Sequence, residues 1–492
     1  MKILFINPPN LPFSESSLLI EPIDTLTVAS HVQSLGHKVS LIDMDVAKRE
    51  GKSIRKEIEE IMPDYIVITF DYHIPLFTSD AIKNVNEIIT VAKSFGKTTI
   101  LGGRLPTYHP NLFLADIIIK GEMEPALKEI FEGEKLHSIK GLILNLEKLN
   151  SAKAKKIKQN KTELTKLNLT HHYHTEKREE YFDLNQLPNC DRRLVDLNNY
   201  IGVRSVLTSR SCVKRCKFCP VPNFWGRYRT KNPEKVVEEI KHLVDECSAK
   251  KIIFLDDNAT VDKKRIKNIC KLLIDKNVKT TLGCLSTVSS YDENIIELMQ
   301  NAGFRWVHYG CEVASDRVLK NLNKNITVKE IKKAIVGTKK KGLRVRTSWI
   351  FDSPTITLKE IDDTIDLILE TKPEEIRIHY LALRAGSEFA NKRIQQNENK
   401  NESNNGDYKI EGNSNIKKQS QKQYIHFNKP HSSFDVPKKE LIEKKVFHLI
   451  SELKKEGYVF VENPSEWKKF KGNKNSKIVS LCPMLYGVGW EQ

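Results

Sequence analysis

Three cysteines in one short segment carry the strongest chemical signal in the sequence. Cys212, Cys216 and Cys219 have the spacing C-x3-C-x2-C within the segment SCVKRCKFCP. Three thiolates this close on one loop can ligate one compact metal centre. Zinc would usually need a fourth protein ligand, and no nearby pair of cysteines or histidines supplies it. Three ligands favour a cubane iron–sulfur cluster with one iron left open for a substrate or cofactor.

Charged and polar side chains that could serve such a centre lie around these cysteines and after predicted strands. The basic residues of the cysteine loop are Arg210, Lys214, Arg215 and Lys217. Asp256, Asp257 and Asn258 follow one predicted strand, and Glu312 ends another. A carboxylate or amide at these positions could bond a ribose hydroxyl or an ammonium group. The alternative role of each acid is that of a helix N-cap or a solvated loop residue.

The remaining cysteines give weaker signals. The chain has nine cysteines in 492 residues, too few for a disulfide scaffold, and none of them precedes Cys190. Three of them fall within helical or strand patterns and are predicted core residues: Cys247, Cys270 and Cys284. Cys311, at a predicted strand end, and Cys482, near the carboxyl terminus, are further candidates for a catalytic role.

The first 135 residues alternate short apolar runs with helical patterns. Five runs predict strands: Lys2–Asn7, Lys38–Ile42, Tyr65–Phe70, Thr99–Leu101 and Asp116–Lys120. Apolar strands separated by helices predict a parallel sheet covered on both faces, hence a doubly wound, flavodoxin-like α/β domain. In that architecture ligands bind at the carboxyl ends of the strands, near the switch point.

A second series of strands and helices is predicted for residues 199–390. Its six strand candidates are Val203–Leu207, Ile252–Leu255, Thr281–Leu285, Trp306–Tyr309, Val345–Phe351 and Ile376–Leu383. Six parallel strands with helical crossovers predict an open sheet or a partial (β/α)6 barrel. The cysteine loop follows the first of these strands, at the rim where such folds carry their chemistry.

Three segments lie outside the two predicted domains. Residues 136–198 are rich in lysine and predict a basic linker. Residues 391–432 are rich in Asn, Lys, Gln and Ser and predict a disordered low-complexity insertion. Residues 433–492 contain one amphipathic helical pattern, Lys438–Glu456, and predict a C-terminal helical cap.

The cysteine loop, with the aromatic Phe218 before its last cysteine, resembles the radical S-adenosylmethionine (SAM) superfamily over residues 199–390. The resemblance implies that the three cysteines hold a [4Fe–4S] cluster whose open iron binds SAM. Reductive cleavage of SAM would then yield methionine and a 5′-deoxyadenosyl radical. SAM contacts are implied in three segments: Phe254–Thr260, Gly310–Ser315 and Trp349–Thr357. Leu381–Ser387 resembles the turn after the family's sixth strand. The cofactor contacts predicted in this domain are Phe218, Asp256, Asp257 and Glu312.

Two positions depart from the family's pattern and bear on the cavity. Asp352 stands where relatives often have a glycine, and Ala385-Gly386 stands where they often have a proline–glycine pair. Either change would alter the substrate cavity or the adenine pocket. Three aromatic residues could line the cavity or pack in the barrel core: Trp306, Tyr309 and Trp349.

Residues 1–135 resemble the cobalamin-binding domain that precedes many radical SAM domains. The resemblance rests on MKILFINPP, Glu21-Pro22, the segment Gly36–Val39, Asp64–Val67 and the glycine pairs or Gly-Glu steps after the later strands. The cobalamin contacts that it implies are Asn7, Pro8, Gly102, Gly103, Gly121 and Glu122. The D-x-H-x-x-G signature of a lower cobalt ligand is absent. The most similar segment begins with Asp71-Tyr72-His73, but Leu76 stands where the signature has glycine.

These resemblances predict a cobalamin-dependent radical SAM enzyme, a methyltransferase if it resembles the larger part of that family. It would methylate an unactivated carbon of a small-molecule or peptide substrate through a 5′-deoxyadenosyl radical and methylcobalamin. The first alternative is a cobalamin-binding cyclase or rearrangement enzyme without methyl transfer. A methylthiotransferase acting on RNA or protein is disfavoured because its second cluster needs amino-terminal cysteines. A non-enzymatic sensor would have little use for an open iron site.

The formal net charge of +17 points at first to a polyanion partner. Much of it lies in the predicted linker, the predicted insertion and helix faces, so a nucleic-acid partner is not expected. No apolar stretch approaches the ~18 residues of a membrane span, and no signal peptide opens the sequence. A reducing cytoplasm is therefore predicted, with flavodoxin or ferredoxin as the electron donor that a radical SAM enzyme implies.

Overall fold

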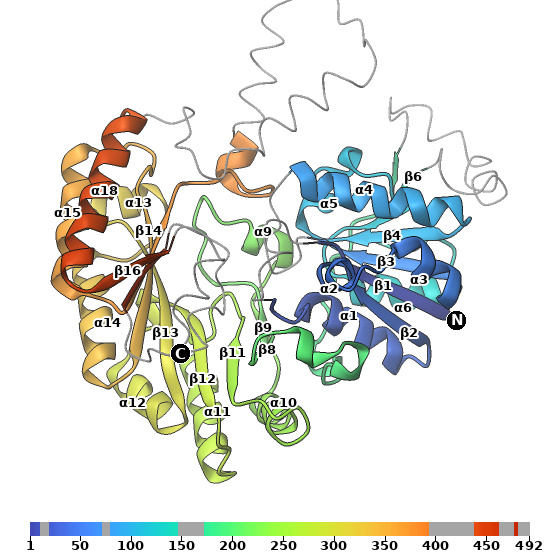
Figure 1. The fold of residues 1–492 in the computed structure, drawn as a ribbon, viewed down its shortest axis with the longest axis horizontal. Helices are drawn as coiled ribbons and strands as arrows, with labels where there is room; N and C mark the ends of the chain where they lie inside the picture. Colours follow the sequence, from blue (N-terminus) through green and yellow to red (C-terminus); the bar gives the residue numbers. More distant parts are fainter. Residues whose placement is uncertain (10–18, 71–78, 146–171, 393–436, 462–476, 481–492) are drawn as a thin grey trace, which may run out of the picture. The chain divides into compact units, whose positions relative to one another are not determined.

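The computed structural model describes residues 1–9, 19–70, 79–145, 172–392, 437–461 and 477–480. The chain divides into two compact units, a first made mainly of residues 1–199 and a second made mainly of residues 200–492 (Figure 1). Each unit is built on its own α/β sheet, as the sequence predicts.

The first unit contains a seven-stranded sheet with the order β2-β1-β3-β4-β5-β6-β7. The five predicted strands are confirmed and pair in parallel: β1 (Lys2–Asn7), β2 (Lys38–Asp43), β3 (Tyr65–Thr69), β4 (Thr98–Gly102) and β5 (Ile117–Ile119). The connecting helices are α1 (Ile23–Ser34), α2 (Met44–Arg49), α3 (Ile54–Ile61), α4 (Ser79–Ser94), α5 (Arg104–Tyr108) and α6 (Met123–Phe131).

The order 2-1-3-4-5 of the parallel strands is that of flavodoxin-like folds. The chain runs from β1 outward to β2 and then back past β1 to β3, which creates a switch point between β1 and β3. Parallel strands bring their carboxyl ends to one edge of a sheet. The predicted cobalamin contacts after β1, β4 and β5 therefore lie along the same edge.

Part of the predicted linker at residues 136–198 is folded into this unit. β6 (Leu142–Asn145) and β7 (His172–His174) extend the sheet in antiparallel pairing, and the unit continues to Asn199. All four residues of β6 are buried against the core. The sequence does not reveal these two strands, because a run of three or four residues within a lysine-rich segment shows little periodicity.

The second unit contains an eight-stranded sheet with the order β16-β17-β15-β14-β13-β12-β11-β8, and all its described pairings are parallel. The six predicted strands are confirmed as β8 (Val203–Val206), β11 (Lys251–Phe254), β12 (Thr281–Thr287), β13 (Phe304–Glu312), β14 (Arg344–Ile350) and β15 (Glu375–His379). The crossover helices are α10 (Pro233–Asp245), α11 (Lys263–Asp275), α12 (Glu293–Asn301), α13 (Asp316–Asn321), α14 (Val328–Lys340) and α15 (Leu358–Thr371).

The predicted helical cap at residues 433–492 contains strands as well as a helix. Helix α18 (Lys439–Lys455) buries apolar side chains such as Leu449 in the core, as its amphipathic pattern predicts. It is followed by β16 (Tyr458–Val461) and β17 (Lys477–Ser480), and β17 pairs with β15 to widen the sheet. The predicted insertion lies outside the described residues beyond residue 392. Within the described ranges, no helix combines the length and apolar character that crossing a membrane requires.

Candidate functional site in the second unit

The three cysteines lie on the loop that follows β8, at one edge of the second sheet. This loop begins at β9 (Ser209–Arg210) and returns at β10 (Arg229–Thr230), and these strands pair antiparallel to close its base. At the base, the fully buried Ser211 has a φ of 77°, and its hydroxyl donates to the Gly226 carbonyl over 2.7 Å. A left-handed serine is a costly conformation, so the surrounding structure fixes the backbone immediately before the first cysteine.

Distant segments of the chain hold the outer part of the cysteine loop. The Lys217 N–H donates to the Leu322 carbonyl over 3.0 Å, and the Lys217 carbonyl accepts from the Phe389 N–H over 3.1 Å. The Asn323 side-chain amide donates to the Arg215 carbonyl over 2.7 Å. The conformation of the loop thus depends on residues beyond α13 and β15 as well as on its own sequence.

The three thiols influence one another's ionisation. Burial raises the pKa of each thiol, and it raises that of Cys219 to about 12. Negative charge on Cys216 or Cys212 would raise the pKa of Cys219 further. The ammonium group of Lys324 acts in the opposite direction on Cys212 and Cys216. Metal binding displaces thiol protons, so a cation beside the loop favours the liganded form.

A buried ion pair lies beside the cysteine loop. Glu312 ends β13, and its Oε1 lies 2.5 Å from the Nζ of Lys324, with both side chains less than a tenth exposed. Glu312 has a φ of 66°, and the pairing of β13 with β14 shifts register between Gly310 and Glu312. Such a bulge re-aims a side chain at a strand end. A Cβ on Gly310 would lie 2.6 Å from Glu312 Oε1, so any larger residue there would require the ends of the paired side chains to shift.

Lys324 also connects this ion pair to the aromatic residue of the cysteine loop. Its Nζ lies 5.9 Å from the centre of the Phe218 ring, within the range of a cation–π contact. Lys324 is not among the predicted site residues, because its setting in NLNKN is typical of a solvated turn. The structure buries it because Glu312 provides a partner.

Asp256 braces the start of the cysteine loop. It is fully buried and accepts hydrogen bonds from the Thr208 N–H at 2.6 Å, the Thr208 hydroxyl at 2.5 Å and the Ser209 N–H at 2.9 Å. These bonds engage both carboxylate oxygens. The structure therefore gives Asp256 a positioning role, and its contact with a ribose or an ammonium group stays a prediction.

The next two residues lie closer to the cysteines. The charge of Asp257 raises the pKa values of Cys212 and Cys219, which places its carboxylate near both thiols. The fully buried Asn258 donates to the Thr287 hydroxyl over 3.2 Å and approaches the Cys212 Sγ at 3.9 Å. Asp257 thus stays a candidate cofactor contact, and Asn258 orients the first cysteine.

The donor set of the cysteine loop fits a cluster. Among the described residues, no three His, Cys, Asp or Glu side chains converge closely enough to hold a single metal ion. A cubane cluster places its three thiolates on three different iron atoms and so needs them farther apart than the ligands of one ion. Three neighbouring thiols on one anchored loop, with a buried lysine nearby, offer the donors that such a cluster uses.

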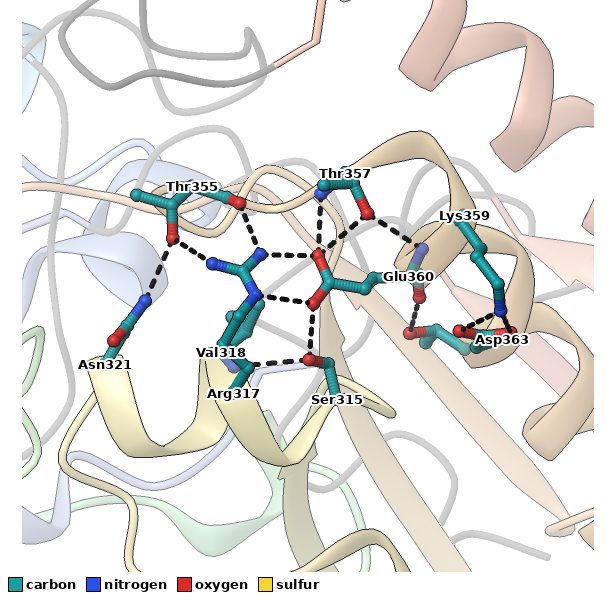
Figure 2. A network of polar contacts seen from close by, with 10 residues as sticks. Ser315, Arg317, Val318, Asn321, Thr355, Thr357, Lys359, Glu360 and Asp363 are labelled. Carbon is teal, nitrogen blue, oxygen red and sulfur yellow. Dashed lines mark hydrogen bonds and ion pairs between the residues drawn. The ribbon is translucent and has the colours of Figure 1, made fainter.

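A polar network ties the loop after β14 to α13 and α15 (Figure 2). The Arg317 guanidinium bonds both oxygens of Glu360, with Nε–Oε1 at 3.0 Å and Nη2–Oε2 at 2.7 Å. The same guanidinium donates to the Thr355 carbonyl over 2.7 Å. Thr355 has a φ of 66°, so these bonds hold a left-handed residue in the loop.

Glu360 is the centre of this network. Its carboxylate accepts from the Ser315 hydroxyl over 2.6 Å and closes a capping box with Thr357 at the start of α15 (Figure 2). Burial alone would raise the pKa of Glu360, but the hydrogen bonds from Arg317, Ser315 and Thr357 outweigh it and lower the pKa to about 2. The carboxylate is therefore charged throughout the physiological range.

The two departures from the family pattern lie at neighbouring turns. The buried Asp352 accepts a hydrogen bond from the Leu381 N–H over 2.5 Å, which links the loop after β14 to the turn after β15. The Asn223 side chain of α9 (Val221–Trp225) donates to the Gly386 carbonyl over 2.7 Å. The Asp352 departure thus serves a contact between rim segments, and the turn that contains Ala385 is bonded to α9 through Gly386.

Several predicted candidates lie elsewhere. Cys311 is fully buried in the hydrophobic core, where burial raises its pKa well above the ordinary value. Tyr309 and Trp349 belong to the same core and so do not line the opposite face of the sheet, whereas Trp306 lies outside that core. Cys482 and His73 lie outside the described residues.

The edge of the first unit and similar proteins

The predicted cobalamin contacts after β1 and β4 are held by local structure. The Asn7 amide donates to Asp43 over 3.2 Å and its oxygen accepts from Thr25 over 3.3 Å, which fixes the side chain at the switch point. Gly103 has φ 139° and ψ 177°, a region open essentially to glycine alone. A side chain on Gly102 would overlap Met123. Glycine is thus favoured at position 103 by the backbone conformation and at position 102 by the packing of Met123.

The contacts after β5 are of two kinds. The Gly121 N–H donates to the Thr107 hydroxyl over 3.3 Å. The Glu122 carboxylate accepts from the Phe182 N–H over 3.0 Å, so it fastens the segment that follows β7. Pro8 is buried directly after β1. Gly121 and Pro8 therefore border the edge, while Glu122 has a structural partner.

Comparison with known proteins identifies the kind of domain that the second unit contains. Residues 206–368 match the family model of the radical SAM superfamily. An uncharacterized methyltransferase of Pyrococcus horikoshii is 28% identical over 386 residues, which cover 74% of this chain and 77% of the relative. An anaerobic magnesium-protoporphyrin IX monomethyl ester cyclase of Synechocystis sp. is 23% identical over 413 residues, which cover 79% of this chain and 76% of the relative.

Solved structures share the fold. The radical SAM methyltransferase TsrM of Kitasatospora setae has a TM-score of 0.65 at 18% identity, covering 79% of this chain and 75% of TsrM. The cobalamin-dependent SAM radical enzyme OxsB has a TM-score of 0.61 at 16% identity, covering 92% of this chain and 61% of OxsB.

The parallel sheet with a three-cysteine loop after its first strand defines the second unit as a radical SAM domain. The chain carries a radical SAM domain at residues 206–368, and this domain and the relative named as a methyltransferase support an enzymatic role. Members of the superfamily use a [4Fe–4S] cluster and SAM. Over most of its length the chain has the fold of TsrM and OxsB.

Proposed function

We propose that this chain is a cobalamin-dependent radical SAM enzyme that methylates an unactivated carbon of a small-molecule or peptide substrate. The observation that carries the proposal is the anchored three-cysteine loop with the buried Glu312–Lys324 pair beside it. The flavodoxin-like order of the first sheet supports the cobalamin part. TsrM and OxsB, which share the fold, have been solved with cobalamin bound.

The protein's own part in this reaction is to bind and position. Cys212, Cys216 and Cys219 would hold the cluster. Phe218, Asp257 and Glu312 would contact SAM. When bound, the cluster and SAM supply a carbon-centred radical and cobalamin carries the methyl group. A flavodoxin or ferredoxin would supply the electron, and a reducing cytoplasm would keep the thiols available.

The carboxyl edge of the first sheet would hold cobalamin. Asn7 and Pro8 at the switch point, with Gly102, Gly103 and Gly121, offer backbone and a fixed amide to a large ligand. Glycines at strand ends allow such close approach. Glu122 would act indirectly, through the segment that it fastens.

Cyclisation or rearrangement without methyl transfer is the second candidate. The observation that favours it is the cyclase of Synechocystis sp., which aligns with 79% of this chain. The relative named as a methyltransferase aligns with a similar share at higher identity, which favours methyl transfer.

Isotope transfer separates the two candidates. Anaerobically reconstituted protein is incubated with cobalamin, reductant, SAM labelled in its methyl group and an extract of small molecules and peptides. Methyl transfer predicts a labelled product alongside S-adenosylhomocysteine. Turnover that forms 5′-deoxyadenosine and an unlabelled product of altered mass would support cyclisation and contradict the methyltransferase proposal.

A further inference from the structure

The turn between α13 and α14 is bound to the cysteine loop on both sides of Lys324. Before Lys324, the Asn323 side-chain amide donates to the Arg215 carbonyl over 2.7 Å. After it, the Asn325 carbonyl accepts from Lys214 Nζ over 3.4 Å. The turn cannot leave the loop without breaking these bonds, so the fold fixes where Lys324 lies relative to the loop.

The turn buries a lysine between two left-handed asparagines. Asn323 and Asn325 have φ values of 55° and 52°, a region that asparagine adopts more readily than most other residues. Lys324 is only 6% exposed, whereas Asn325 is exposed. Lysine is almost never fully buried without a partner, and the carboxylate of Glu312 is that partner here.

The ion pair turns its cationic member towards the cysteine loop. Lys324 Nζ lies 2.5 Å from Glu312 Oε1 and 5.9 Å from the centre of the Phe218 ring, and Phe218 directly precedes Cys219. Burial has the largest effect on the Cys216 thiol and raises its pKa, but among the charges Lys324 lowers this pKa more than Glu312 raises it. The positive end of the pair therefore acts more strongly on the loop than the negative end.

A fixed positive charge near an iron–sulfur cluster favours the form of the cluster that carries one more electron. Net charge is one of the properties by which a protein sets the potential of such a cluster, and burial reduces the screening of that charge by solvent. We propose that Lys324, held in place by Glu312, raises the reduction potential of the cluster. It thereby favours the transfer of one electron to the cluster from a flavodoxin or ferredoxin, which is oxidised by that electron.

Lys324 would thus be a positioning residue that acts on the cluster without ligating it. The inference rests on the proposed function, since it takes Cys212, Cys216 and Cys219 as the ligands of the cluster. It adds a role for the ion pair in the step that precedes any cleavage of SAM.

The reduction potential of the cluster tests the inference without turnover. The full chain with a reconstituted cluster is titrated anaerobically with dithionite and redox mediators, and visible absorbance and electron paramagnetic resonance report the reduced fraction. SAM is left out, so contacts with SAM do not enter. At a fixed ambient potential, Lys324→Met is expected to lower the ratio of reduced to oxidised cluster about tenfold, which equals 59 mV for one electron.

Glu312→Gln is expected to shift the ratio in the opposite direction. It removes the negative member of the pair and leaves the ammonium group, so the ratio of reduced to oxidised cluster should rise at least threefold. Both variants break the same ion pair and would disturb the packing of the turn alike. Opposite shifts of the potential therefore report charge and not a loss of structure.

Two further variants are matched controls. Lys324→Arg keeps the positive charge and is expected to change the ratio less than threefold. Lys320→Met removes an exposed lysine of α13 and is expected to leave the ratio unchanged. If Lys324→Met does not take up a complete cluster, the direction of the shift in Glu312→Gln still decides.

Two results would overturn the inference while the proposed function stands. One is a complete cluster in Lys324→Met and Glu312→Gln with the potential of the wild type. The other is a shift of both variants in the same direction, which would assign the ion pair to holding the turn in place. Wild-type protein that takes up no iron would overturn the proposed function and this inference with it, and iron quantification separates that case from the first two.

Discussion

The side chains that act on the three cysteines come mostly from other segments of the chain. The sequence shows the cysteine spacing, because C-x3-C-x2-C lies within eight consecutive residues. Lys324 and Asn258 lie far from the loop in sequence, yet Lys324 lowers the pKa of the Cys216 thiol and Asn258 lies 3.9 Å from Cys212 Sγ. Long-range contacts of this kind leave no local pattern that a single sequence could show.

At the residue scale, Cys216→Ala tests the assignment of the cluster ligands. We expect the variant to retain well below half of the roughly four iron atoms per chain of a complete cluster, because one thiolate is lost. Iron and sulfide quantification measure this, together with visible absorbance. Cys247→Ala, which changes a half-buried cysteine outside the loop, is the control. Equal iron in Cys216→Ala and wild type would rule out the ligand assignment.

Asp256→Asn tests the brace at the start of the loop. The substitution removes the negative charge and replaces the oxygen that accepts from the Thr208 hydroxyl with an NH2 group, while the remaining oxygen can still accept from the Thr208 and Ser209 N–H groups. We expect a loss of about 1–3 kcal/mol in the free energy of unfolding, because buried hydrogen bonds to a charged acceptor are lost or weakened. Urea unfolding measures it against the exposed Asp275→Asn as control. A loss no greater than the control's would show that the brace contributes nothing.

At the scale of elements, long periodic segments were predicted well and short edge strands were not. Eleven strands follow apolar runs that the sequence shows, such as Tyr65–Thr69 of β3. By contrast β7 and β17 have three and four residues, and their pairing with a neighbouring strand defines them. Neither apolar content nor periodicity reveals a strand of that length.

The network of Figure 2 positions the loop after β14, where the family resemblance places SAM contacts. Arg317→Met removes the bonds to Glu360 and Thr355. We expect the Kd for SAM to rise roughly tenfold, with a smaller change in the maximal rate of 5′-deoxyadenosine formation. Lys359→Met, which breaks only the exposed pair with Asp363, is the matched control. If Arg317→Met lowers the unfolding midpoint but leaves the Kd for SAM unchanged, the network stabilises the fold and does not position SAM contacts.

The acid response of the same network follows from the pKa of Glu360. Folding lowers this pKa from 4.5 to about 2, so the charged carboxylate stabilises the fold above pH 4.5. That contribution is lost as the pH falls from 4.5 towards 2, because the unfolded chain takes up a proton first. The difference in urea midpoint between wild type and Glu360→Gln should therefore be largest at pH 7 and shrink by pH 3. A difference that grows on acidification would contradict the assigned direction.

At the scale of the whole molecule, the order of the domains predicts the function better than the net charge does. The net charge of +17 suggested nucleic acid, whereas the comparisons and the fold lead to a radical SAM enzyme. The order of a doubly wound unit before a three-cysteine sheet was visible in the sequence, since both units consist mainly of long, regular repeats of strand and helix. The boundary at residue 135 was not visible, because β6 and β7 return to the first sheet.

Gly103→Ala tests whether the first unit is the cobalamin-binding part of the molecule. Alanine is strained at φ 139° and adds a methyl group at the edge of the sheet. We expect the Kd for cobalamin to rise about tenfold while iron content stays unchanged. Gly133→Ala, at φ 86° with open space around it, controls for backbone strain away from the edge. Equal effects of both variants on cobalamin binding would argue against this location.

The formation of 5′-deoxyadenosine tests the central claim most directly. Full-length protein with a reconstituted cluster is incubated anaerobically with SAM and a strong reductant, and the nucleoside is quantified by mass spectrometry. The account predicts 5′-deoxyadenosine from the wild type and none above background from Cys212→Ala, Cys216→Ala or Cys219→Ala. Wild-type protein with a full complement of iron that forms no 5′-deoxyadenosine, or a cysteine variant that forms as much as the wild type, would contradict it.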